Sequence, residues 1–479
     1  MSETTTLHPC IVAGRKVTTD NHLTVTNPYN GDEIGQVCLA GPEQLEAAIA
    51  AAVEAFEELR KAPRHQRSAW LQSIADRLKD RSEEVAKTLM AEAGKPIKFA
   101  RGEVGRAIAT FEIAAREAMT FGGHVVPMDM SSAGDGYVAY TKRVPAGPTA
   151  AISPFNFPLN LVSHKVAPSL AVGNPVILKP ASTTPLTALL LAEVVAEAGV
   201  PEKAFSVLPM RGAQAEKLAT DERIKVLTFT GSPKVGWHLK QLAAKKKVLL
   251  ELGGNAPVII HEDANLDFAA PRVAVGGYAF AGQVCISVQR VLVHRPIYDQ
   301  FKQRYVKAVQ DLGYGDPADE NTICGPLIEE DEVARVADWV DKARQAGASL
   351  LCGGQADGRM YQPTVLENVK SDMLVSCDEV FGPVTSLYAY DTFEEALELA
   401  NDPNYGLQAG VFTRDIGRIL QAHDELDFGG VIINDYPTFR VDQMPYGGVK
   451  DSGFGREGLI YAMEEMSEIR LMVLNRNGL

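Results

Sequence analysis

Residues 226–254 read VLTFTGSPKVGWHLKQLAAKKKVLLELGG, and this stretch decides the fold. An apolar run at 226–230 is followed by a glycine turn, a segment as long as one helix, and a second apolar run at 248–250. A strand, a helix and a strand in this order predict a parallel βαβ unit. The turn between Gly231 and Gly236 would place a helix N-terminus at the end of the first strand, where a pyrophosphate could be held.

The same alternation continues on both sides of this unit. Short β-rich runs separated by helix-length segments lie at 149–153, 175–178 and 205–208, and again at 258–260, 291–294, 384–388, 409–413 and 431–434. Before residue 122, apolar steps of three and four predict helices, the first of which starts near Pro42. The chain is therefore predicted to be α/β, with two α/β domains that meet near residues 253–254.

Composition and charge limit the class of protein and its partners. Of the 479 residues, 46% are hydrophobic and 23% are charged, as in ordinary globular enzymes of several domains. The net charge of −14 repels nucleic-acid phosphates and anionic lipid, so neither is expected as a partner. Two long uncharged stretches, 144–164 and 273–289, are interrupted by prolines or by glycines and glutamines, so no membrane span is expected. Residues 1–8 lack the features of a secretory signal.

The cysteines are scattered and do not suggest a disulfide framework. No C-x-x-C pair and no Cys/His cluster at metal-ligand spacing is present, so no metal site is predicted. The simplest interpretation is a cytoplasmic protein with reduced thiols. The six residues are Cys10, Cys38, Cys285, Cys324, Cys352 and Cys377.

Three polar residues stand in surroundings that favour acyl chemistry. Cys285 lies in the charge-free segment GQVCIS, Glu251 ends an apolar strand, and Asn156 lies in ISPFNFP. A lone cysteine among apolar residues is usually an inert core residue. A thiol nucleophile, a carboxylate base and an amide donor are, however, the three groups that acyl chemistry requires.

A second glycine motif, at residues 453–458, fits the pattern G-x-G-x-x-G but not its usual context. A dinucleotide fingerprint needs a preceding strand and a βαβ unit of about 30 residues around it. The chain ends soon after residue 458, so this motif predicts a turn before the last helix.

These residues stand in segments that resemble the NAD(P)-dependent aldehyde dehydrogenase superfamily, and the resemblance covers essentially the whole chain. The matching segments follow the family's order and spacing and lie at 152–158, 179–181, 229–236, 250–257, 282–285, 379–383 and 445–458. The resemblance implies an aldehyde dehydrogenase-like fold with a Rossmann-type cofactor domain, an α/β catalytic domain and a small β arm for oligomerisation. These parts would span 1–122 with 146–253, 254–469, and 123–145 with 470–479. The resemblance also implies a homodimer or a homotetramer, the oligomeric states common in this family.

The resemblance also implies a mechanism and a set of site residues. Cys285 would attack the aldehyde, Asn156 and the Cys285 N–H would hold the oxyanion, and Glu251 would activate water. A thiohemiacetal and then a thioester on the cysteine would lead to the free acid, with NAD or NADP as the hydride acceptor. The residues expected to bind the cofactor are Ile152, Ser153, Pro154, Phe155, Lys179, Ser182, Gly231, Ser232, Gly236, Leu252, Glu379 and Phe381.

Cofactor preference and substrate are less determined by the resemblance. Many NAD-preferring members carry Glu where this chain has Ser182, so NADP is not excluded. Residues 283–290 resemble the lactaldehyde and semialdehyde dehydrogenase branches. Arg106 and Arg440 could bind an anionic aldehyde, although either could instead form a structural ion pair.

Two alternative functions remain at this stage. In a CoA-acylating semialdehyde dehydrogenase, CoA rather than water would take the acyl group. A catalytically idle member of the family would keep the fold for structure or binding. The presence of Cys285, Asn156 and Glu251 speaks against the idle member, and Glu251 speaks against the CoA-dependent enzyme.

Overall fold

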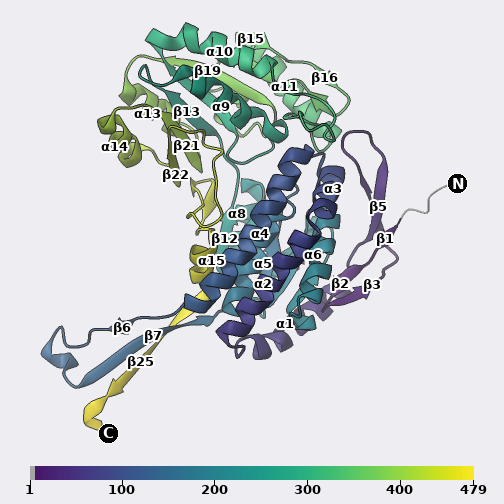
Figure 1. Cartoon of the computed structure of the whole chain (residues 1–479), viewed down its shortest axis with the longest axis vertical. Helices are drawn as coiled ribbons and strands as arrows, with labels where there is room; N and C mark the ends of the chain where they lie inside the picture. Colours follow the sequence, from purple (N-terminus) through teal and green to yellow (C-terminus); the bar gives the residue numbers. More distant parts are fainter. Residues whose placement is uncertain (1–5, 479) are drawn as a thin grey trace.

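The computed structural model describes residues 6–478 and shows two α/β bodies with a β arm that extends from one of them (Figure 1). The predicted α/β class is confirmed by two large, mostly parallel sheets. Residues 1–5 lie outside the described residues. They belong to the segment 1–8, which was compared with a secretory signal, and to the predicted range 1–122. Residue 479, at the end of the predicted arm, also lies outside the described residues. Within the described chain, none of the helices is both long enough and apolar enough to span a membrane.

The first body is built on an eight-stranded sheet whose five central strands run parallel. Its antiparallel edge strands come from the chain start on one side and from near the chain end on the other. In spatial order the strands are β24 (Gly453–Phe454), β12 (Lys247–Glu251), β11 (Val226–Thr230), β8 (Thr149–Ile152), β9 (Val176–Lys179), β10 (Phe205–Val207), β2 (Cys10–Val12) and β3 (Arg15–Val17).

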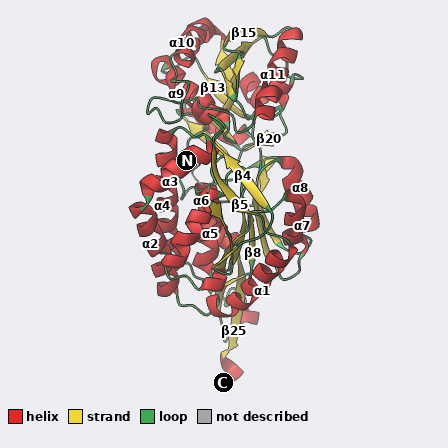
Figure 2. Ribbon diagram, turned by 90° about the vertical axis from the view of Figure 1, so that its right-hand side faces the viewer, coloured by secondary structure: helices red, strands yellow, loops and turns green. Residues whose placement is uncertain are grey.

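Helices cover both faces of this sheet (Figure 2). One face carries α2 (Arg64–Asp80), α3 (Ser82–Ala93), α4 (Ile97–Thr120), α5 (Asn160–Val172), α6 (Leu186–Glu197) and α15 (Leu459–Glu465). The other carries α1 (Pro42–Leu59), α7 (Gly212–Thr220) and α8 (Pro233–Leu242). The helix predicted from Pro42 is therefore confirmed, since α1 begins at that proline, where the missing N–H costs nothing.

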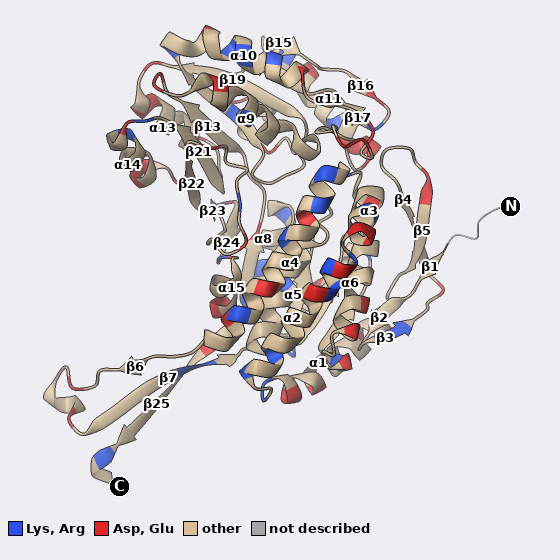
Figure 3. Cartoon of the chain, in the orientation of Figure 1, with Lys and Arg blue, Asp and Glu red and all other residues tan. Residues whose placement is uncertain are grey.

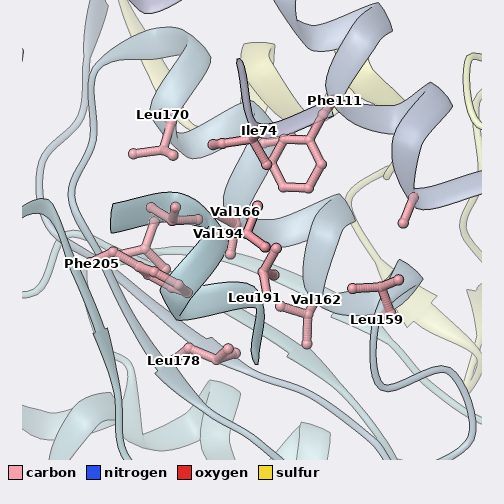
Figure 4. Packing of buried hydrophobic residues seen from close by; sticks show 14 of the residues in the cluster. Ile74, Phe111, Leu159, Val162, Val166, Leu170, Leu178, Leu191, Val194 and Phe205 are labelled. Atoms are coloured by element: carbon pink, nitrogen blue, oxygen red, sulfur yellow. The ribbon is translucent and has the colours of Figure 1, made fainter. Parts of the chain in front are cut away.

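The core between α2, α4, α5 and the sheet shows why these helices form. Ile74 of α2, Phe111 of α4 and Val166 of α5 are fully buried and pack toward Leu178 of β9 (Figure 4). Every residue of α5 is buried, so it is a central helix rather than a surface one. Its N-terminus lies directly after the segment that carries Asn156, and there the Leu159 and Asn160 N–H groups donate to the Glu103 carboxylate of α4.

The second body has a seven-stranded sheet that is parallel except at one edge. Alternate residues of its strands serve opposite faces: Val258 packs with α9 and α10, and Ile259 packs with α13 and α14. The strands in spatial order are β15 (Ser349–Cys352), β18 (Thr364–Glu367), β19 (Val384–Tyr390), β14 (Val288–His294), β13 (Ala256–Ile260), β21 (Gln408–Phe412) and β22 (Gly430–Ile433). The helices are α9 (Leu266–Tyr278), α10 (Tyr298–Gln310), α11 (Glu330–Gln345), α12 (Leu374–Cys377), α13 (Phe393–Asn401) and α14 (Ile416–Glu425).

The arm is a three-stranded antiparallel sheet with the order β25 (Ser467–Asn475), β7 (Tyr137–Pro145) and β6 (Val125–Val126). Both β6 and β7 lie within residues 123–145. β25 begins at Ser467, three residues before the expected start of the arm, because Ser467 already pairs with Pro145. Smaller sheets consist of β1 (Leu7–His8), β5 (Glu33–Cys38) and β4 (His22–Thr26), of β16 (Ala356–Asp357) and β17 (Met360–Tyr361), and of β20 (Tyr405–Gly406) and β23 (Val449–Lys450).

The segment near the C-terminus returns to the first body. The glycine motif at 453–458 forms the short strand β24 and then the turn before α15, as predicted for the turn. Gly453 can pair with β12 because glycine has no Cβ. In any other residue the Cβ would lie 2.5 Å from the Leu250 carbonyl oxygen. Both elements come from the range expected for the catalytic domain, yet they complete the first sheet and its core. Acidic and basic residues are spread over both bodies (Figure 3).

Candidate active site

Two cavities meet at Cys285, in the space between the two bodies. The larger, about 770 Å³, lies beyond the carboxyl ends of β8, β9, β11 and β12. The smaller, about 490 Å³, lies between α4, the segment around Cys285 and the loop 436–446. Cys285 and Leu161 line both cavities. A group bound in one cavity would therefore meet a group bound in the other at the Cys285 thiol.

The larger cavity brings together the residues expected to bind the cofactor, with one exception. Gly236 does not line it; instead the residue lets α8 approach Leu252, since a Cβ at Gly236 would lie 2.3 Å from the Leu252 side chain. Leu252 lines the cavity, so Gly236 affects the cavity wall indirectly, by leaving space for the Leu252 side chain. The lining residues among those expected are Ile152, Ser153, Pro154, Phe155, Lys179, Ser182, Gly231, Ser232, Leu252, Glu379 and Phe381.

The N-terminus of α8 opens into this cavity. Ser232 is the N-cap residue and Pro233 is the first residue of the helix, directly after β11 and Gly231. A Cβ at Gly231 would lie 2.6 Å from the Phe229 ring, so a larger residue would have to displace that ring. Free N–H groups and the positive end of the helix dipole suit a pyrophosphate at this place.

Lys179 and Glu379 present a buried cation and a buried acid to the same cavity. The Lys179 side chain has no acidic partner in the described chain, and burial lowers its pKa. Burial raises the pKa of Glu379 to about 8, although its Oε1 accepts a hydrogen bond from the Gly254 N–H at 2.8 Å. Gly253 leaves room for this carboxylate, since a Cβ would lie 2.4 Å from Glu379 Oε2. An unpaired ammonium and an acceptor beside glycines suit the hydroxyls of a dinucleotide ribose.

The segment before Cys285 has an unusual backbone. Phe280 and Ala281 have φ of 53° and 55°, which L-residues adopt rarely, and Gly282 follows with φ of 69°. The Gln283 side chain fixes this turn by donating to the carbonyl oxygens of Phe280 and Pro326 and by accepting from the Ile328 N–H. Strained backbone of this kind persists where surrounding contacts hold it, and it is concentrated at functional sites.

Asn156 is aimed at the same turn. Its Nδ2 donates to the Gln283 carbonyl oxygen at 2.9 Å, and the residue is 3% exposed. An amide nitrogen carries two hydrogens, so the second N–H of Asn156 remains available at the wall of the larger cavity. Together with the backbone N–H of Cys285, it could hold a developing oxyanion next to the sulfur.

Burial strongly perturbs the Cys285 thiol. Desolvation raises the pKa of Cys285 to about 12, and a hydrogen-bond contact of 3.0 Å with the Tyr446 hydroxyl acts in the opposite direction. Nearby Glu379 and Glu251 disfavour the thiolate, whereas Arg440 favours it. The thiol therefore needs the local donors in order to ionise.

Glu251 lies behind the site, at the end of β12, and lines neither cavity. It is 4% exposed, and its Oε2 has no hydrogen-bond partner among residues 6–478. Burial, and next the negative charge of Glu457, raise the pKa of Glu251 well above its usual value. Burial also opposes ionisation of Glu457, but Lys165, at 3.0 Å, and His164 outweigh it and lower its pKa. Of the two acids, Glu457 thus holds the negative charge and Glu251 holds the proton.

The smaller cavity has a basic lining. The two arginines expected to bind an anion both reach it, and both also form the alternative ion pairs: Arg106 with Asp442 at 2.8 Å and Arg440 with Glu457 at 3.2 Å. The Arg440 side chain is 5% exposed, and that of Arg106 is 29% exposed, so Arg106 is the more accessible of the two.

Lys98 adds an exposed ammonium to this lining, and no ion pair is found for it within residues 6–478. It lies two turns before Arg106 on the same face of α4, and Gly102 between them leaves open space.

Sequence reasoning missed Tyr446 and Lys98. Tyr446 stands in a segment that matched the family, but the sequence gives no sign that its hydroxyl reaches Cys285. Lys98 carries no local signal that separates it from other surface lysines. Its place on one helix face with Arg106 could have been noticed from the spacing of eight residues.

One group of potential metal ligands forms outside the two cavities. His261, Glu262 and His294 place ligand atoms within 4.8 Å of one another. Their strands are distant in sequence, which is why no metal spacing was visible. The two imidazole rings stack with centroids 4.4 Å apart and planes 9° apart, so their lone pairs run side by side and do not converge on one point. The group is therefore not assigned as a metal site.

Comparison with known proteins identifies what the chain is similar to. Residues 16–472 match the model of the aldehyde dehydrogenase family. The chain is 44% identical over 465 residues to 3-sulfolactaldehyde dehydrogenase of Priestia megaterium, covering 97% of each protein. It is also similar to the structure of aldehyde dehydrogenase 21 from Physcomitrella patens in complex with the reaction product succinate, with 44% identity, a TM-score of 0.97 and 99% of each chain covered. A third relative is glyceraldehyde-3-phosphate dehydrogenase GapN from Methanocaldococcus jannaschii complexed with NADP, with 40% identity, a TM-score of 0.92, and 95% of this chain and 100% of that chain covered.

Proposed function

The chain belongs to the aldehyde dehydrogenase family, and we propose that it oxidises a short aldehyde with an anionic tail to the free carboxylic acid. It is an aldehyde-oxidising oxidoreductase that uses NAD or NADP. The observation that carries the proposal is the place of Cys285, which lines both the cavity suited to a dinucleotide and the cavity with a basic lining. A thiol at this place can bond to the carbon of an aldehyde in the smaller cavity while the cofactor occupies the larger cavity.

The first half of the reaction depends on Cys285 and Asn156. The thiolate attacks the aldehyde carbon, and the oxygen that becomes negative is held by the Asn156 amide and the Cys285 N–H. In related chemistry one such donor contributes roughly 3 kcal/mol to the transition state. When bound, NAD or NADP would supply the hydride acceptor, and loss of the hydride would leave the substrate carbon as a thioester on Cys285. Residues that support this cofactor fit are the unpaired Lys179 ammonium and the glycines Gly231 and Gly253, whose missing side chains leave room.

The second half depends on Glu251, which we assign as the base that activates water against the thioester. Its side chain must turn from behind the site toward Cys285, or act through a water, because it lines neither cavity. A carboxyl group whose pKa is raised by burial is a stronger base once ionised than an exposed one. A CoA-dependent enzyme would have less need of Glu251 as a base. A catalytically idle protein would need none of the three residues Cys285, Asn156 and Glu251.

The anionic tail is supported by the charges around the smaller cavity. Four cationic residues, Lys95, Lys98, Arg106 and Arg440, line this cavity of about 490 Å³, and Lys95 is paired with Glu103 in the same lining. The names of the relatives point the same way, since 3-sulfolactaldehyde, succinate and glyceraldehyde 3-phosphate carry a sulfonate, a carboxylate and a phosphate. We therefore favour a sulfonated or carboxylated aldehyde of about three or four carbons for this chain.

Replacing Arg106 with leucine should raise KM for an anionic aldehyde by about 10- to 100-fold, since a hydrogen bond to a charged group contributes roughly 1.5–3 kcal/mol. Its partner Asp442 keeps hydrogen bonds from His164 and Asn160, so the fold should tolerate the change. The measurement is steady-state kinetics with succinate semialdehyde and with propanal. Arg101→Leu is the matched control, because Arg101 lies on the same helix, is ion-paired and lines neither cavity. A parallel loss for both aldehydes would show that Arg106 has only a structural role.

Replacing Ser182 with glutamate should shift cofactor preference toward NAD. Ser182 is exposed and lines the larger cavity, and a carboxylate there would accept a hydrogen bond from the ribose 2′-hydroxyl and repel a 2′-phosphate. The gain for NAD is up to about tenfold if one hydrogen bond worth roughly 1.4 kcal/mol forms. The measurement is the ratio of kcat/KM for NAD and NADP, with Ser182→Ala as the control. An unchanged ratio in the glutamate variant would place residue 182 away from the ribose.

The arm supports a proposal about assembly. Its strands expose apolar side chains, among them Val125 at 79%, Ile469 at 62% and Leu471 at 55%. An apolar sheet with a free edge is suited to pairing with a second copy, so we propose a homodimer or homotetramer. We further propose that the parts of the chain act as a cofactor domain, a catalytic domain and an oligomerisation arm in a cytoplasmic enzyme.

The proposal is tested by measuring NADH and NADPH formation with a panel of aldehydes. The panel contains succinate semialdehyde, 3-sulfolactaldehyde, lactaldehyde and propanal, and the products are identified by mass spectrometry. We expect the two anionic aldehydes to have the highest kcat/KM and the product to be the free acid. Equal kcat/KM for anionic and neutral aldehydes would contradict the proposed substrate class.

A further inference from the structure

The hydroxyl of Tyr446 lies 3.0 Å from the Cys285 sulfur, on the side of the smaller cavity. This is the one hydrogen bond that the hydroxyl makes to any described residue. A buried tyrosine hydroxyl normally has a partner, and here the partner is the residue proposed to attack the substrate. The contact is therefore at the reacting atom.

Three features hold the Tyr446 ring in this position. The residue is 2% exposed and packs with Val284, Ile286 and Leu407. Its backbone exchanges two hydrogen bonds with Glu457, at 3.0 Å and 2.7 Å. The Arg440 guanidinium stacks on the ring, 3.6 Å from the centroid, and this cation is fixed in turn by Glu457. The hydroxyl consequently loses little conformational freedom when it forms a hydrogen bond with the Cys285 sulfur.

The contact changes character when the thiol ionises. In the neutral state the S–H and the O–H can each donate, and both bonds to sulfur are weak. A thiolate can only accept, so Tyr446 must then donate, and a hydrogen bond to an ionised group is about twice as strong as a neutral one. The hydroxyl thus stabilises the nucleophilic form more than the resting form.

On this basis we propose that Tyr446 is a catalytic residue, whose hydroxyl donates to the Cys285 thiolate and so raises the fraction of nucleophile present at neutral pH. The inference rests on the proposed function of Cys285. The other charged groups near the sulfur do not replace this donor: Glu379 and Glu251 disfavour the thiolate, and Arg440 acts through space while engaged with Glu457.

The test is the pH dependence of Cys285 alkylation in the full-length enzyme and in Tyr446→Phe. Iodoacetamide is used without cofactor or aldehyde, and labelling of the peptide that contains Cys285 is followed by mass spectrometry, since the exposed Cys377 will also react. Phenylalanine keeps the ring and its stacking with Arg440. Because burial raises the pKa of Cys285 to about 12, the alkylation rate between pH 6 and pH 10 follows the thiolate fraction. We expect this rate to fall about tenfold in Tyr446→Phe throughout that range, with unchanged labelling of Cys377 and an unchanged unfolding temperature.

Tyr390→Phe is the matched control, because its hydroxyl is also buried but contacts His261 and lines neither of the two cavities. Its alkylation profile should equal that of the unmodified enzyme. Identical alkylation rates for Tyr446→Phe and the unmodified enzyme would overturn the inference, as would a slower rate accompanied by a lower unfolding temperature, which would indicate altered packing. The outcome is separable from the proposed function: if no aldehyde is oxidised but the profile shifts, the hydroxyl still serves the thiolate and the proposed activity fails.

Discussion

Cys285→Ala is expected to abolish aldehyde oxidation, by roughly 10⁴-fold or more, because Cys285 is the only thiol among the residues that line the two cavities. Cofactor binding should stay near normal, since the larger cavity is lined by many other residues and loses only one sulfur atom. The two measurements are NAD(P)H formation at saturating aldehyde and the dissociation constant of the cofactor from the quenching of protein fluorescence.

The other cysteines supply the controls for this variant. Cys324 is fully buried in the second body, Cys377 is exposed, and neither lines the two cavities. Cys324→Ala and Cys377→Ala should therefore retain turnover. Substantial activity in Cys285→Ala, or an equal loss in either control, would show that the nucleophile has been assigned to the wrong residue.

Glu251→Gln is expected to separate the two halves of the reaction. Hydride transfer does not need the carboxylate, so a burst of one NAD(P)H per active site should appear. Steady-state turnover should then fall by about 10²- to 10⁴-fold, the usual contribution of a general base, because water alone attacks the thioester slowly. Rapid mixing with detection of NAD(P)H gives both quantities. Glutamine has nearly the same shape as the protonated carboxyl that burial and the neighbouring Glu457 favour, so the fold should tolerate the change.

Addition of CoA distinguishes the main alternative in the same experiment. If water is the acyl acceptor, CoA should not accelerate turnover of the unmodified enzyme, and the product should be the free acid. Acyl-CoA as the main product, or a normal steady-state rate in Glu251→Gln, would overturn the assignment of Glu251. Asp263→Asn, at a partly buried acid outside both cavities, controls for a general effect of replacing a carboxyl group with an amide.

The fold was predictable because local signals and the fold agree. The apolar runs at 226–230 and 248–250 became β11 and β12, with α8 between them, since buried parallel strands favour continuous β-branched and apolar residues. The contribution of β24 and α15 to the first body could not be read from the sequence. This contribution depends on the close approach of two strands that Gly453 permits. No feature of the sequence near residue 453 indicates that its partner strand is β12, about two hundred residues earlier.

The candidate site was predictable where it depends on motifs and less so where it depends on geometry. Gly231, Lys179 and Glu379 lie in segments whose order the family resemblance supplies, and they do line one cavity. The hydroxyl of Tyr446 and the ammonium of Lys98 depend on distances between segments far apart in the chain. Arg440 shows the limit most clearly, because it lines the cavity and also forms a buried ion pair, two interpretations that the sequence presented as alternatives.

The most direct test of the central claim is the mass of the acyl-enzyme. Glu251→Gln enzyme is mixed with NAD and succinate semialdehyde, quenched in acid within the burst, digested, and analysed by mass spectrometry. We predict an acyl group on the peptide that contains Cys285, released by hydroxylamine as a thioester would be, and absent when NAD is omitted. An acyl group on another residue, or a burst of NADH with no acyl group on Cys285, would contradict covalent aldehyde oxidation at this thiol.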